Sequence, residues 1–235
     1  MHRVLHAFTN PFAFRQALPD IWSGFLINVH MMVIAEALVL VLALLIAIVR
    51  GLPGRGAKPF RGLAILYTDF FRGTPLTIVA YACILGLPGL GYGLLKHASS
   101  EALGIVALTV VYTAYVTEVY RAGIESVHGS QRMAARSLGL SYMQALRYVV
   151  LPQAIRRVIP PLLNDFIGLQ KDTAIIGAIG VTEAAAQGTN FANSYFNYTG
   201  YFVGAVFFVY LTIPLARFTD HLVAKRERLE RAAAF

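Results

Sequence analysis

Five segments of the chain are apolar over a length that could cross a membrane. They comprise residues 29–49, 74–94, 102–120, 158–181 and 200–216. About 20 apolar residues in a helix cover the hydrocarbon core of a bilayer. The pattern therefore predicts an all-α integral membrane protein with five transmembrane helices. The consecutive prolines at 160 and 161 should interrupt the fourth of them and unwind its backbone.

A polar segment, residues 121–157, separates the third and fourth apolar runs. Within it, Met133, Ala134 and Leu138 occur at helical spacing, and Gly139 follows where a left-handed residue would end a helix. The pattern predicts a short helix that stops at this glycine.

A second short helix should begin at Ser141, because this residue can cap it, with Gln144 as the partner of a capping box. Pro152 is expected to end that helix by restricting the residue before it. In isolation, this pair of helices resembles a DNA-binding helix-turn-helix. A protein that binds the DNA major groove, however, needs a soluble globular domain around the motif. Here two membrane-spanning helices flank the pair, which favours docking on a soluble partner at the membrane face.

Composition supports a membrane protein and argues against a metal site, an internal disulfide or a catalytic site. The chain is 57% hydrophobic and 14% charged, whereas about a quarter of the residues in a soluble domain are charged. The six histidines form no metal-ligand motif, the single Cys83 cannot form an internal disulfide, and no catalytic constellation is present. We expect neither a metal nor a cofactor bound by this chain.

The net charge of +8 follows from topology and does not require nucleic acid. Residues 50–61, 121–157 and the tail from Arg217 hold fifteen of the twenty lysines and arginines. The positive-inside rule then places the 121–157 loop and the C-terminus in the cytoplasm and the N-terminus outside. The basic residues are also expected to attract anionic lipid.

The spacing in the polar segment resembles the cytoplasmic loop of permease subunits from bacterial ABC importers. In that family the loop reads E-A-A, three residues, G, nine residues, I, one residue, L-P. Here Ala134 and Ala135, Gly139, Val149 and the pair 151–152 occupy the corresponding positions. Met133 replaces the family glutamate, which removes a carboxylate that helps to fix the loop on the ATPase.

Further motifs are similar to the polar amino acid branch of that family, which includes histidine, arginine, glutamine, glutamate and cystine systems. They lie at residues 70–76 (FFRGTPL), 115–124 (YVTEVYRAGI), 151–154 (LPQA), 160–161 (PP), 169–173 (LQKDT) and 179–183 (IGVTE). The resemblance implies a five-helix type I importer fold in the bacterial plasma (inner) membrane. It divides the chain into an interfacial segment (1–21), a transmembrane domain (22–225) and a basic cytoplasmic tail (226–235).

The resemblance also implies the partners. The permease would pair with a second permease subunit, identical or homologous, and with two copies of an ATP-binding subunit. An extracytoplasmic binding protein would deliver the amino acid, and ATP and Mg²⁺ would be held by the ATPase. The contacts with the ATPase fall on the coupling residues Gln131, Arg132, Met133, Ala134, Ala135, Arg136, Gly139, Leu140 and Ser141.

Ionisable residues inside the predicted spans are candidates for substrate contact, because each costs about 3 kcal/mol to insert at the bilayer centre. Lys171 could bind the α-carboxylate of an amino acid, and Asp172 or Glu118 the ammonium. The full candidate set is Tyr115, Glu118, Asp165, Lys171, Asp172 and Thr173. Alternatively, these charges pair with one another and stabilise the packing of helices.

Two other functions remain possible from the residues alone. An ion-coupled secondary transporter could use the same intramembrane acids, although the sequence shows no convincing internal repeat. A membrane-anchored regulator could use the helix-turn-helix-like loop. A chain that lacks an ATP-binding motif must take its energy from a partner or from an ion gradient. The source of energy therefore separates the ABC importer permease from the secondary transporter.

Overall fold

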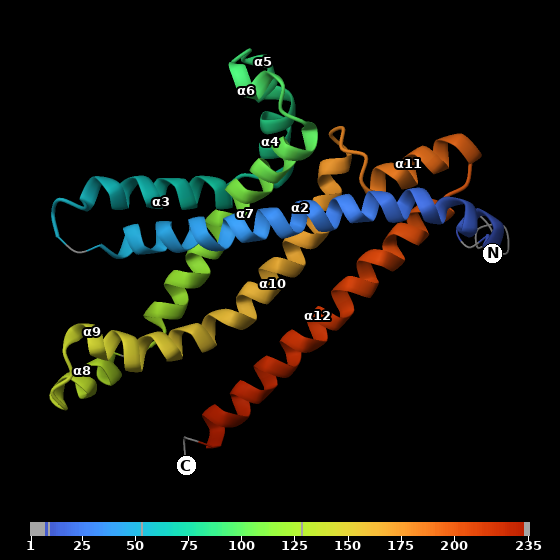
Figure 1. Ribbon diagram of the computed structural model, residues 1–235. Coiled ribbons are helices and arrows are strands. Elements are labelled where there is room, and N and C mark those ends of the chain that lie inside the picture. The colour runs from blue at the N-terminus through green and yellow to red at the C-terminus, as the bar shows by residue number, and fades with distance from the viewer. Residues whose placement is uncertain (1–7, 9, 53, 128, 233–235) are drawn as a thin grey trace. The chain divides into compact units, whose positions relative to one another are not determined.

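The computed structural model describes residues 8, 10–52, 54–127 and 129–232, and these residues form helices joined by short turns (Figure 1). The principal helices are α2 (Pro11–Gly51), α3 (Lys58–Gly73), α4 (Leu76–Tyr81), α5 (Leu87–Gly89), α6 (Gly93–Lys96), α7 (Ser100–Glu125), α8 (Gly129–Ser137), α9 (Tyr142–Ala145), α10 (Leu151–Gly177), α11 (Ala184–Tyr195) and α12 (Thr199–Ala232). Two π-helical segments, η1 (Ala82–Gly86) and η2 (Leu146–Val150), follow α4 and α9.

Three of these helices are long and apolar enough to cross a membrane: α2, α7 and residues Thr199–Lys225 of α12. The pair formed by α3 and the helical stretch Leu76–Gly89 meets the same criteria as one broken span, with a bend of 104°. The fourth predicted span falls within α10, which has 27 residues but is less apolar because it contains several charged side chains. The predicted class, an all-helical membrane protein, is confirmed.

The helices are longer than the apolar runs that predict them. α2 begins at Pro11 and passes through Pro19, so residues expected to be interfacial continue into the first span. Likewise, α12 extends from the last apolar run to Ala232 and takes in most of the predicted tail. Helix α3 was not predicted, since its charged and apolar residues alternate with a helical period and not as one apolar run.

Two predictions about proline are wrong. α10 continues without interruption through Pro160 and Pro161. A proline removes one backbone donor, yet it fixes φ near the helical value, and the long helix tolerates the loss. Pro152 does not end a helix either, because η2 precedes it and the Leu151 N–H bonds to Leu146 O. The missing donor of Pro152 therefore falls where the hydrogen-bond ladder changes from the π to the α pattern.

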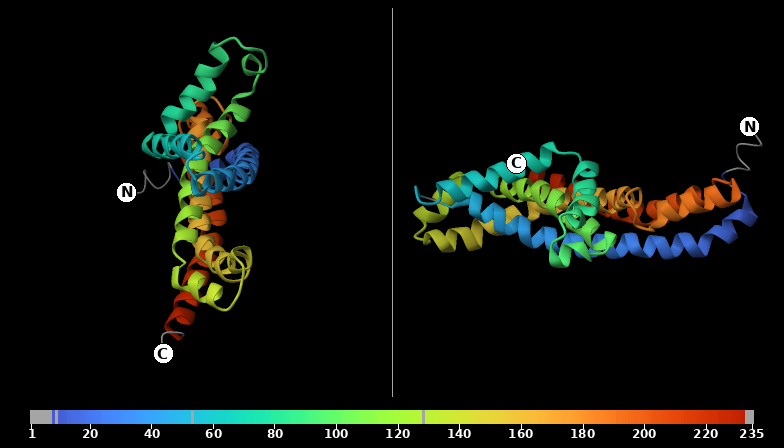
Figure 2. Two further views of the ribbon diagram at one scale, coloured as in Figure 1. Left: turned by 90° about the vertical axis from the view of Figure 1, so that its left-hand side faces the viewer. Right: turned by 90° about the horizontal axis from the view of Figure 1, so that it is seen from above.

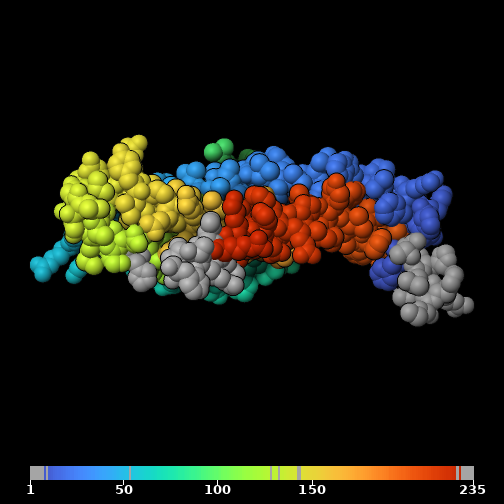
Figure 3. All heavy atoms as spheres, turned by 90° about the horizontal axis from the view of Figure 1, so that it is seen from below, coloured from blue at the N-terminus to red at the C-terminus, as the bar shows by residue number. Residues whose placement is uncertain are grey.

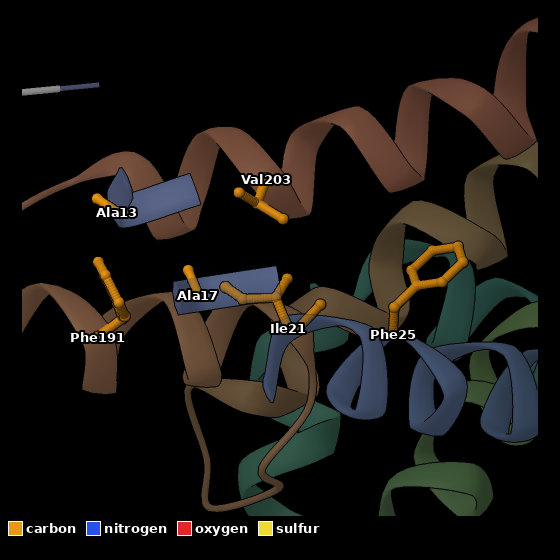
Figure 4. Packing of buried hydrophobic residues seen from close by; sticks show 7 residues of the cluster. Ala13, Ala17, Ile21, Phe25, Phe191 and Val203 are labelled. Atoms are coloured by element: carbon orange, nitrogen blue, oxygen red, sulfur yellow. The ribbon is translucent and has the colours of Figure 1, made fainter. Parts of the chain in front are cut away.

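The chain divides into two compact units, which we describe separately. Unit 1 contains residues 1–38, 74–111 and 167–215. Its core joins one face of α2 to α11 and the start of α12, as Figure 4 shows. The cluster comprises Ala13, Ala17, Ile21, Phe25, Ala184, Phe191 and Val203. The first four recur every four residues, so they form a single stripe on α2.

Close backbone approach also holds α11 against the start of α12. The orange ribbon in Figure 2 contains both segments. A Cβ added at Gly200 would lie 3.2 Å from the Cα of Gly188 and from the Cβ of Phe191. The two glycines therefore allow the helices to cross at a short distance.

Unit 2 contains residues 39–73, 112–166 and 216–235. A small core of Val127, Val150 and Ala154, with Leu146 packed against it, connects the end of α7 with η2 and α10. A Cβ at Gly123 would collide with Val158, so α7 and α10 also meet closely here. The atoms of α8 and α9 lie uncovered on the side shown in Figure 3.

Candidate functional site: a docking loop and a charged cleft

The loop between α7 and α10 has the local structure that its sequence predicts. Gly139 has φ +86°, a left-handed conformation that favours glycine. The Leu140 N–H bonds to Ala135 O at 3.2 Å, and the Gly139 N–H bonds to Arg136 O at 3.0 Å. These two bonds form a Schellman motif, which satisfies the carbonyls at the end of α8 and stops the helix at the predicted residue.

The second helix begins with the predicted capping box. The Gln144 N–H donates to Ser141 Oγ at 3.2 Å, and the Ser141 N–H donates to Gln144 Oε1 at 2.8 Å. Because both ends of the turn are held by local bonds, the loop has a defined shape before any partner binds.

Most coupling residues of α8 are accessible. Met133 is 64% exposed, and Leu138, which follows α8 and is not a predicted coupling residue, is 84% exposed. Gln131, Ala134, Arg136 and Ser141 are exposed as well. Ala135, in contrast, is buried, with 5% exposure. The side chain of Arg132 lies outside the described part of the structure.

Three of the predicted substrate residues meet in one cleft of unit 2. The cleft has a volume of about 410 Å³ and lies between the α3 end, α7 and α10. It is lined by Arg72, Tyr115, Glu118, Val119, Ala122, Gly123, Ser126, Arg157, Pro161 and Asp165. Two cations and two carboxylates therefore face a single hollow, a combination suited to a small zwitterion.

Glu118 lies at the centre of an ion-pair network. It accepts hydrogen bonds from Arg50 and, at 2.7 and 2.9 Å, from Arg121. Arg72 is 3.9 Å away, and Arg50 also donates to Thr68 at 2.9 Å. The Arg50 and Glu118 side chains are only 13% and 14% exposed. This arrangement agrees with the alternative in which buried charges pair and tie helices together.

Asp165 differs from Glu118 because its carboxylate is not committed to a cation among the described residues. Its Oδ2 atom is buried and has no hydrogen-bond partner there. Elsewhere in the cleft lining, Arg157 donates to the carbonyl of Ser126, and Tyr115 donates to the carbonyl of Arg72 at 3.4 Å. A buried carboxylate oxygen without a donor is costly, so this atom calls for a ligand or a proton.

The remaining predicted residues, Lys171, Asp172 and Thr173, belong to unit 1 and do not line this cleft. Lys171 is exposed, whereas Thr173 is buried. The Thr173 hydroxyl donates to Gln170 O at 2.7 Å and accepts from Asn28 Nδ2 at 3.0 Å. Its hydrogen-bonding capacity is therefore used within the protein.

The polar network that surrounds Thr173 was not predicted from the sequence. Glu183 is fully buried and accepts from Asn28 Nδ2 at 2.9 Å. It also caps α11 by accepting from the N–H groups of Ala185 and Ala186 at 2.9 and 2.8 Å. In return, the Ala184 N–H donates to Asn28 Oδ1 at 3.1 Å. The acid directly before a helix was a visible capping signal, but no local signal pointed to Asn28.

Residues 43–228 match the family described as "Binding-protein-dependent transport system inner membrane component", and the chain belongs to this family. It is thus the membrane-spanning permease subunit of such a transport system, as the sequence predicts. The described residues contain no group of three or more His, Cys, Asp or Glu side chains that could hold a metal ion.

Named relatives make the comparison more specific. The chain is 37% identical over 172 residues to the probable glutamine ABC transporter permease protein GlnM of Bacillus subtilis, which covers 73% of this chain and 78% of that protein. It is 37% identical over 185 residues to the glutamate transport system permease protein GluC of Corynebacterium glutamicum, covering 72% and 80%.

Solved structures agree with the fold. The crystal structure of an amino acid ABC transporter with histidines matches with a TM-score of 0.83 and 28% identity, covering 92% of this chain and 99% of that one. The MetNI methionine ABC transporter matches with a TM-score of 0.65 at 21% identity, which supports the fold alone.

Proposed function

We propose that this chain is the permease subunit of an ATP-driven importer that carries a polar amino acid into the cytoplasm. The observation that carries this proposal is the cleft of unit 2, in which Asp165 and two arginines surround a space of amino acid size. The similarity to permeases named for glutamine and glutamate supports the same substrate class.

Within the cleft, we assign the substrate ammonium to Asp165, whose buried Oδ2 has no donor among the described residues. The α-carboxylate would pair with Arg72, which is 44% exposed and only loosely paired with Glu118. Tyr115 holds the backbone of Arg72 and so positions this wall. Lys171 and Asp172 form a second proposed contact group further along α10.

Energy would come from a partner that docks on the loop. Two ATP-binding subunits, holding ATP and Mg²⁺, would each contact the exposed face of one α8, in a complex with two permease subunits. An extracytoplasmic binding protein would deliver the substrate. The proposed orientation places the N-terminus outside and the 121–157 loop and the C-terminus in the cytoplasm of a bacterial cell, as the distribution of basic residues favours.

The experiment is reconstitution of the affinity-purified complex in liposomes, with uptake of radiolabelled amino acids measured with and without ATP. Asp165→Asn should abolish uptake while the ATP-binding subunit still co-purifies. Asp220→Asn is the matched control, because Asp220 is an exposed acid in a loose pair with Arg217. Full uptake by Asp165→Asn would refute the site. Uptake driven by a proton or sodium gradient without ATP would instead favour a secondary transporter.

A further inference from the structure

The outer turn between α11 and α12 combines features that do not fit exposure to bulk water. No Lys, Arg, Asp or Glu occurs between residues 184 and 216. A helix facing water normally carries charges, yet the exposed positions of α11 are only Thr189, Asn190, Asn193, Ser194 and Tyr195. The helix is too polar for the hydrocarbon core and too poor in charge for an aqueous surface.

Three aromatic side chains gather where α11 ends. Tyr195 is 54% exposed, Phe196 92% and Tyr198 50%. The Tyr195 ring packs on Phe191 at 4.7 Å between centroids, and the Tyr198 ring stacks on Tyr201 at 6.4 Å. Each tyrosine ring therefore packs against another ring of the protein, whereas Phe196 is the most exposed of the three side chains.

The backbone at Phe196 is in an unusual conformation. Its φ of 48° makes it the only residue other than glycine with positive φ among the described residues. This left-handed conformation is unfavourable for a bulky side chain, and it ends α11 by turning the chain. The fold therefore accepts strain at a position where it also exposes a large apolar ring.

We propose that Tyr195, Phe196 and Tyr198 form an aromatic anchor that inserts into the lipid headgroup interface. The occupant follows from the position, because the membrane-spanning part of α12 begins at Thr199, directly after the anchor. Aromatic residues are enriched at this level of a bilayer, where an amphipathic ring contacts both acyl chains and headgroups. The uncharged amide face of α11 suits the same boundary.

Tryptophan fluorescence in brominated lipids tests the anchor directly. The chain has a single tryptophan, Trp22, so the background is Trp22→Phe. In this background, Phe196→Trp reports on the anchor, and Ser137→Trp is the control at an exposed position of the polar helix α8. Both proteins are reconstituted in phosphatidylcholine that carries bromine high on the acyl chains.

We expect Phe196→Trp to be quenched by the brominated lipid several-fold more strongly than Ser137→Trp, with the opposite order for aqueous iodide. If Phe196→Trp does not fold, Tyr198→Trp replaces it. Quenching of the anchor by iodide and not by lipid would overturn the proposal and favour docking of a soluble protein. Protection from both quenchers would also overturn it, and would indicate a protein interface. The readout requires neither substrate nor ATPase.

Discussion

Replacing Glu183 by alanine is expected to destabilise unit 1 strongly. The carboxylate is fully buried and accepts from three donors: Asn28 Nδ2 and the N–H groups of Ala185 and Ala186. The carboxylate is also closely packed, because a Cβ at Gly177 would collide with Glu183 Oε1. Truncation would therefore leave the donors buried and unsatisfied.

The magnitude follows from these contacts. Loss of the helix cap costs about 1–2 kcal/mol. An orphaned amide at Asn28 adds about 1–3 kcal/mol. Together these give about 4 kcal/mol, which corresponds to a fall in Tm of roughly 10 °C for a chain of this size.

Glu183→Gln should be intermediate, at about 2 kcal/mol, because it keeps the volume but directs an NH₂ group toward a donor. A flip of the Asn28 amide cannot relieve this conflict. Asn28 Oδ1 accepts from the Ala184 N–H, so the flip would place Nδ2 against that donor. The expected order of Tm is wild type, then Glu183→Gln, then Glu183→Ala.

The assay is thermal unfolding in detergent with a thiol-reactive fluorogenic dye. Cys83 is the only cysteine, it is partly buried, and it belongs to unit 1, so its labelling reports the unfolding of this unit. Thr182→Ala is the control, because Thr182 is the exposed neighbour of Glu183. A Tm for Glu183→Ala equal to that of the control would refute the structural role of the network.

Two further predictions concern unit 2. Gly139→Val should abolish ATP-driven uptake yet leave membrane insertion intact, because a β-branched residue is strained at φ +86° and would distort the loop. Normal uptake would contradict this prediction, and Gly129→Ala, at an exposed glycine, serves as control. Glu118→Gln should destabilise the protein by about 3 kcal/mol, since Arg50 would lose its buried counter-charge. Unfolding of unit 2 is followed with the same dye at a buried cysteine of that unit, Val150→Cys in a Cys83→Ser background. Glu125→Gln, whose carboxylate is 61% exposed, should show almost no change in Tm, and similar values for both variants would count against the prediction.

The sequence by itself determined the features that depend on neighbouring residues. Apolar runs identified the spans in α2, α7 and α12. Gly139 marked the end of α8, and the Ser141–Gln144 pair marked the start of α9. Each of these signals acts within one or two turns of helix, so its energy is the same wherever the segment packs. The prolines predicted helix ends that do not occur, because η2 and the surrounding helix compensate for the missing N–H donors.

Only the tertiary structure decided which buried polar groups meet. Asn28 and Glu183 are 155 residues apart, and Arg50 and Glu118 are 68 apart. No pattern in the sequence assigns such partners, since a carboxylate in a span can bind a substrate, a cation or a helix end equally well. Helix packing selected among these partners. It paired Glu118 with arginines and Glu183 with the start of α11, and it left Asp165, which lines the cleft, with one buried oxygen that has no partner among the described residues. Burial makes each choice costly to reverse, because an unpaired polar group in a low-dielectric interior has no water to replace the lost partner.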